Sequence, residues 1–214
     1  MRFISMHKAT QDMEAGTPPP PAVMEAMGPM IGEMMQAGIF LAGEGLRPSA
    51  YGVRVQFRGG ERTITPGPFT GGTNESIDRY LIVRVPSIED AIEWAARFAG
   101  DADTEIDVRP VTEMWDLGMM PKPPDVTSTR FMILQKSGAT AYGERPQADG
   151  AVVLASEALE PEARGVRLRF RKGDCIVIDG PFTESKELIA GFSILDVASR
   201  EEAMHWATRF ASLF

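Results

Sequence analysis

The chain has 214 residues, of which 43% are apolar and 24% charged, and its formal net charge is −8. This length fits one large domain or two of about 100 residues each, and the apolar fraction excludes a wholly disordered chain. The acidic balance argues against nucleic-acid binding, which needs clustered basic side chains. We find no charged-then-apolar leader and no apolar run near the roughly 20 residues that span a bilayer. We therefore expect a cytoplasmic protein that binds no membrane.

The expected elements start with an alternating strand over 3–8, in which Phe3, Ser5 and His7 share one face. Methionines recur at three- and four-residue spacing over 22–36, which predicts an amphipathic helix. Pro29 argues against an unbroken helix, because a proline ring clashes with the preceding turn.

Alternating apolar and polar side chains predict a strand over 52–58, and a further strand is expected over 80–85. A glycine turn after the first of them leads into a short strand that ends at Gly67-Pro68-Phe69. Ser87 has Asp90 three positions later, which predicts a serine-capped helix. A further strand is expected over 105–111.

Much of this pattern occurs twice. Residues 41–70 align without gaps on 154–183, with 16 identical positions out of 30. Residues 80–100 align on 192–212 with 10 identities in 21. The opening strand over 2–8 resembles residues 130–136. We interpret the sequence as a tandem duplication.

The duplication sets the expected domain boundaries. Residues 1–112 form the first repeat, 113–128 a linker that is apolar enough to pack, and 129–214 a second, shortened repeat. The second repeat has a Gly- and Ala-rich loop in place of the helix at 22–36, and it has no equivalent of the strand at 105–111.

Runs of strands followed by a helix indicate an α+β fold with mainly antiparallel sheets. A single helix-covered face leaves the other face of each sheet bare. We therefore expect the two repeats to bury these bare faces against each other.

The run Asp-Gly-Pro-Phe-Thr-Glu-Ser-Lys-Glu at 179–187, followed by Gly191-Phe192, resembles the signature of the DGPF proteins within the YCII-related superfamily. Residues 43–48 and 108–111 are also similar to that family. The resemblance implies two ferredoxin-like repeats that pair into a dimeric α/β barrel, here within one chain. Most members of the family have no established activity. The resemblance also implies a His–Asp pair for proton transfer, and DGPF genes often accompany sigma-factor genes.

His7 and Asp179 are the candidate catalytic residues. An imidazole in a cleft between the sheets could shuttle protons near neutral pH, and a carboxylate could orient it. Otherwise His7 is a strand-end histidine, and Asp179 bonds its own turn. The first repeat has Pro66 where the second has Asp179, and the second has Gln135 where the first has His7. Neither repeat holds a complete pair, so we favour loss of the proton-transfer dyad.

Two further pairs of equivalent residues are candidate ligand-binding groups. Arg54 and Arg167 could bind a carboxylate or phosphate, or they could belong to a solvated strand face. Glu44 and Glu157, placed after the second strand of each repeat, could face a pocket or pair with an arginine. One cysteine and no clustered ligands predict no metal site, and no motif indicates a cofactor.

These observations favour a YCII-like protein that binds a small molecule or a protein partner in the inter-sheet cleft without retained catalysis. One alternative is a small-molecule isomerase or lyase that uses His7 in acid–base chemistry. Another is an accessory protein to sigma-factor transcription control. A strand edge left open in the second repeat would favour a homodimer.

Overall fold

The computed structural model describes the whole chain except residues 70–76, 101–102, 137–152, 161, 172–173, 183–187 and 214. The chain forms two compact units. Unit 1 comprises Met1–Gly45, Glu162–Phe182 and Ile189–Phe214, and unit 2 comprises Leu46–Pro161 and Thr183–Leu188. Each unit therefore takes strands from both halves of the sequence.

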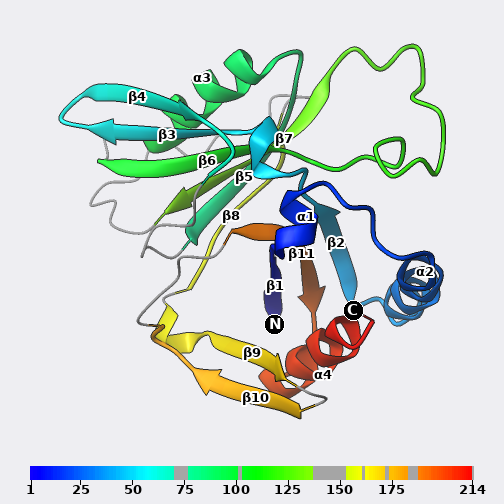
Figure 1. Cartoon of the computed structure of the whole chain (residues 1–214). Coiled ribbons are helices and arrows are strands. Elements are labelled where there is room, and N and C mark those ends of the chain that lie inside the picture. The colour runs from blue at the N-terminus through cyan, green and yellow to red at the C-terminus, as the bar shows by residue number, and fades with distance from the viewer. Residues whose placement is uncertain are drawn as a thin grey trace. The chain divides into compact units, whose positions relative to one another are not determined.

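Unit 2 is built on a six-stranded antiparallel sheet in the order β4-β3-β6-β7-β5-β8 (Figure 1). Its strands are β3 (Val53–Arg58), β4 (Glu61–Pro66), β5 (Ile77–Val85), β6 (Thr104–Pro110), β7 (Thr129–Lys136) and β8 (Val153–Ala158). Helix α3 (Ile88–Ala99) packs on one face, and a short 3-10 helix (Ser49–Tyr51) precedes β3.

The core of unit 2 lies between α3 and the sheet. The helix begins as expected, because the Ser87 side chain accepts a hydrogen bond from the Asp90 amide at 3.1 Å. Phe98 on α3 and Val55 on β3 are fully buried in this core. The alternation of β3 in the sequence therefore predicts correctly which of its side chains face the helix.

Unit 1 contains two separate sheets, β1-β11-β2 and β10-β9. Its strands are β1 (Arg2–Lys8), β2 (Phe40–Gly45), β9 (Val166–Arg171), β10 (Asp174–Asp179) and β11 (Ile189–Asp196). Its helices are α1 (Gln11–Glu14), α2 (Pro21–Gln36) and α4 (Arg200–Ala211), with a 3-10 turn at Glu162–Arg164. Helix α4 contacts both β1 and β9, and so touches both sheets.

The methionine stripe of α2 packs in the core of unit 1. Met30 and Met34 are buried against Trp206 of α4, whereas Met35 is 62% exposed, so the buried stripe is narrower than the sequence suggests. The helix runs unbroken through Pro29, contrary to the expected interruption.

The two units pair their strands in the same register. In unit 1, β1 pairs with β11 so that Phe3 lies opposite Leu195. In unit 2, β7 pairs with β5 so that Phe131 lies opposite Val83, and these are the aligned positions of the two sequence halves. Likewise β2 pairs with β11, and β8 with β5. We call aligned residues or elements of the two halves counterparts.

The comparison of counterparts shows that each unit combines the first two strands of one half with the remaining strands of the other. The α+β class and the antiparallel sheets are confirmed. The described strands form open sheets and no closed barrel, because the six-stranded sheet ends at β4 and β8 and the sheets of unit 1 are not joined. The linker is only partly packed, since Met114, Met119 and Met120 are exposed.

Candidate functional site

His7 lies on the helix-covered side of β1, against α4. Its imidazole stacks on the Phe210 ring with the centroids 4.3 Å apart and the planes at 29°. The Nε2 atom is buried and has no hydrogen-bond partner. Burial lowers the pKa of His7 from 6.5 to about 4, because the charged imidazolium loses its hydration. His7 is therefore a half-buried ring that is neutral at pH 7.

Asp179 occupies the last position of β10, before the cis peptide bond between Gly180 and Pro181. Its side chain is 75% exposed and accepts a hydrogen bond from the guanidinium of Arg200, at the start of α4. The carboxylate is thus held in a surface ion pair and not by its own turn. The hydrogen bond that a His–Asp dyad requires is not made in the described part of the chain.

Arg54 belongs to a buried charge network on the face of the unit 2 sheet opposite α3. Its Nε donates to Asp107 Oδ1 at 2.7 Å and lies 3.1 Å from Glu105 Oε1. Lys136 Nζ lies 2.9 Å from Glu105 Oε1 and 3.2 Å from Asp107 Oδ2. The side chains of both carboxylates and of the lysine are at most 7% exposed. We call these four residues the unit 2 network.

The network is electrically balanced, with two cations and two carboxylates on three adjacent strands. Gln56 Nε2 completes it by donating to Glu105 Oε2 at 2.8 Å. Buried charges of this kind are tolerated when they are paired and hydrogen-bonded. Arg54 is therefore held by residues of its own unit, and it does not lie on the solvated strand face of the alternative interpretation.

The counterpart positions in unit 1 carry three cations. Lys8 on β1 is the counterpart of Lys136, and Arg167 and Arg169 on β9 are the counterparts of Arg54 and Gln56. Burial and the positive charges of both arginines lower the pKa of Lys8 from 10.5 to about 8. We call Lys8, Arg167 and Arg169 the unit 1 cationic cluster.

Arg167 keeps one feature of its counterpart. Its guanidinium lies 4.5 Å from the centroid of the Phe182 ring, as that of Arg54 does from Phe69. The carboxylates that surround Arg54 lie on β6, and among the described residues of unit 1 no strand occupies the corresponding position. Sequence reasoning identified both arginines but missed the lysines and the carboxylates of β6.

Glu44 and Glu157 lie inside β2 and β8, not after the strands as expected. Both are half-buried, and they lie opposite Phe192 and Tyr80 at counterpart positions of their ladders. Both take part in further interactions. Their pairing with aromatic residues is thus a shared feature of the two units.

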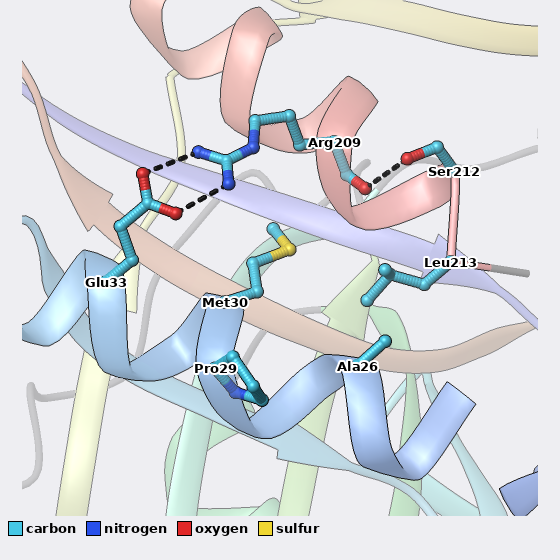
Figure 2. Close-up of a pocket in the computed structure, with 7 residues that line it drawn as sticks. All are labelled: Ala26, Pro29, Met30, Glu33, Arg209, Ser212 and Leu213. Carbon is cyan, nitrogen blue, oxygen red and sulfur yellow. Dashed lines mark hydrogen bonds and ion pairs between the residues drawn. The ribbon is translucent and has the colours of Figure 1, made fainter. Parts of the chain in front are cut away.

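A groove of about 280 Å³ lies between α2 and α4 of unit 1 (Figure 2). Met30, Leu213 and Ala26 contribute apolar side chains to it. At its rim, the guanidinium of Arg209 donates to both carboxylate oxygens of Glu33, at 2.9 and 2.6 Å. The groove thus combines apolar side chains with an ion pair at its rim, and it offers both polar and apolar surface.

The structure thus defines an α+β protein with two antiparallel units of matching register. No group of three or more His, Cys, Asp or Glu side chains in the described ranges could hold a metal. Among the same residues, no helix is both long enough and apolar enough to cross a bilayer.

Comparison with known proteins finds a YCII-related domain at residues 130–211. This segment runs from β7 to α4 and contributes strands to both units. A distant relative, an uncharacterised protein of Rhizobium meliloti (strain 1021), is 45% identical over 49 residues. That match covers 23% of this chain and 40% of the relative's length. No solved structure matches the chain.

Proposed function

We propose that the chain is a YCII-related binding protein for a small molecule or a protein partner, and that it has not retained proton-transfer catalysis. The observation that carries this proposal is the environment of His7, which stacks on Phe210 and has a buried Nε2 with no carboxylate partner among the described residues. General acid–base catalysis is most efficient when the pKa of the catalytic group lies near the working pH. A pKa of about 4 leaves His7 uncharged and weakly basic at neutral pH.

The environment of Asp179 supports the same conclusion. An orienting carboxylate in a histidine dyad is normally buried and accepts the ring N–H. Asp179 is instead an exposed residue in an ion pair with Arg200. The replacement of its counterpart by Pro66, and of the counterpart of His7 by Gln135, is consistent with a site that selection no longer maintains.

The proposed architecture is a duplicated DGPF-type repeat, 1–112 and 129–214, in which the two repeats exchange their opening strands. The identical registers of β1 on β11 and of β7 on β5 support a common origin of the repeats. So does a shared hydrogen bond: the Gly67 amide donates to the Gly52 carbonyl, and at the counterpart positions Gly180 donates to Gly165. The intrachain barrel and the cleft between the repeats stay predictions.

The test is an NMR titration of the two imidazole rings in the full chain. We expect His7 to titrate with a pKa near 4 and to be unaffected by Asp179→Asn, with the exposed His205 as an internal reference. A pKa of His7 near or above 6.5 that falls in the Asp179→Asn variant would reveal a working dyad. That result would favour the isomerase or lyase alternative and refute the proposal.

No observation at the candidate site favours any one of the remaining expectations over the others. A sigma-factor-associated partner, a homodimer and a cytoplasmic location stay predictions from the sequence.

A further inference from the structure

The outer edge of β10 has no partner strand among the described residues, because β10 pairs there only with β9 (Figure 1). Side chains alternate along a strand, and those of β10 are exposed on both of its faces. Val177 is 52% exposed on one face, and Ile176 is 47% exposed on the other. Cys175, on the face of Val177, is also exposed. A partner that covered one face would leave the other bare, whereas a strand added to the edge would contact both.

The counterpart strand β4 is also an edge strand, but it carries residues that protect an edge. Arg62 forms a surface ion pair with α3 at 2.7 Å, and Pro66, which has no backbone N–H, ends the strand. Charged side chains and prolines are common devices against pairing with other chains. Three polar residues of β4, namely Arg62, Thr63 and Thr65, are replaced in β10 by Cys175, Ile176 and Ile178. The edge of β10 is therefore less protected than the same edge of unit 2.

Two copies of β10 match each other when they pair antiparallel with Ile176 opposite Ile176 of the second copy. A two-fold axis relates such strands, so each copy uses the same edge and the association closes at two. Cys175 then lies opposite Val177 of the second copy. On this face the row continues into Phe170 of β9, which is paired with Cys175 in the hairpin and is 43% exposed. Apolar side chains thus meet apolar side chains across the edge.

The charges of the β9–β10 hairpin are complementary in the same register. Asp174 lies opposite Ile178 of the second copy and not opposite another carboxylate. Because Ile178 is paired with Arg167 in the hairpin, Arg167 of the second copy lies on the same face as Asp174, two strands or about 10 Å away between Cα atoms. The two-fold axis repeats this arrangement, so opposite charges of the two copies approach each other at both ends of the paired strands.

We propose that β10 is an interface between two copies of this chain, in which the open β10 edges pair antiparallel about Ile176 and the two hairpins form one four-stranded sheet. A second copy is the occupant because the edge complements itself, in apolar side chains and in charge, under a single two-fold operation. Main-chain hydrogen bonds supply the affinity, and the alternate side chains fix the register. The inference gives the homodimer expected from the sequence a specific surface. It does not depend on the proposed function, because none of its residues takes part in the described contacts of His7.

Sedimentation velocity of the full chain tests the interface. We expect a reversible equilibrium between monomer and dimer, with a dissociation constant that rises about tenfold or more in Val177→Lys, because a charge enters an apolar pair. The matched control Ile64→Lys places the same charge at the counterpart position of β4 and should change the dissociation constant by less than about twofold. A second variant, Ile176→Thr/Ile178→Thr, gives β10 the residues that β4 carries and should also weaken the dimer. Circular dichroism verifies that each variant is folded.

Chemical crosslinking locates the contact, because Cys175 is the one cysteine of the chain. In the proposed register the two Cys175 residues are diagonal neighbours with Cα atoms about 7–8 Å apart, so a short bis-maleimide should link two copies. The variant Cys175→Ser/Arg62→Cys moves the thiol to the counterpart position of β4 and should give no covalent dimer. A monomer at millimolar protein, growth beyond the dimer, equal effects of Val177→Lys and Ile64→Lys, or equal crosslinking at the two thiol positions would each overturn the inference.

Discussion

Removal of Arg54 should strongly destabilise unit 2. In the Arg54→Ala variant, Asp107 and Glu105 lose a guanidinium at 2.7 and 3.1 Å, and among the described residues Lys136 is the cation that remains bonded to them. Arg54 is only 14% exposed, so water can compensate little for the lost partner. Breaking a buried ion pair from one side costs about 3–5 kcal/mol, and we expect the free energy of unfolding of unit 2 to fall by about 3 kcal/mol.

The counterpart variant Arg167→Ala removes one of the charges that lower the pKa of Lys8. We therefore expect the pKa of Lys8 to rise toward its usual value in this variant.

The assay for Arg54→Ala is urea denaturation followed by circular dichroism, combined with hydrogen exchange of β3, β6 and β9 to assign the loss to a unit. Urea is used because guanidinium chloride would screen the charges under study. Arg54→Lys serves as the matched control and should recover part of the stability. A loss below about 1 kcal/mol for Arg54→Ala would refute the conclusion that Arg54 is a main partner of the buried β6 carboxylates.

Three further variants or labels test other parts of the structure. His7 gains its proton near pH 6.5 in the unfolded chain and near pH 4 in the folded chain. The free energy of unfolding should therefore decrease by up to about 3 kcal/mol as the pH falls through this window. In urea titrations, His7→Gln should remove that part of the pH dependence. At pH 8, Lys8 should react with acetic anhydride faster than Lys122, since the pKa of Lys8 is about 8. Peptide mass spectrometry measures both rates, and equal rates would contradict the lowered pKa. In Gly191→Ala the added Cβ would lie 2.7 Å from the Glu44 carbonyl oxygen. The free energy of unfolding, measured by thermal denaturation, should therefore decrease by at least about 1 kcal/mol. An unchanged melting temperature would exclude this close approach.

The local elements could be predicted from the sequence because they depend on nearby residues. Alternation located β3 and β9, and Ser87 and Ser199 cap α3 and α4 as their spacing with acidic residues indicates. The choice of strand partners could not be predicted. The two halves have similar residues at the pairing positions, so a single sequence contains no signal that selects the exchanged pairing.

The candidate site was predicted only in part, for a related reason. The partners of Arg54 lie on β6 and β7, far along the chain, although the alternation of Glu105 and Asp107 is visible in the sequence. The stacking of His7 on Phe210 depends on how α4 packs on β1. Burial then determines the pKa, and no spacing rule reports the burial of a strand-end residue.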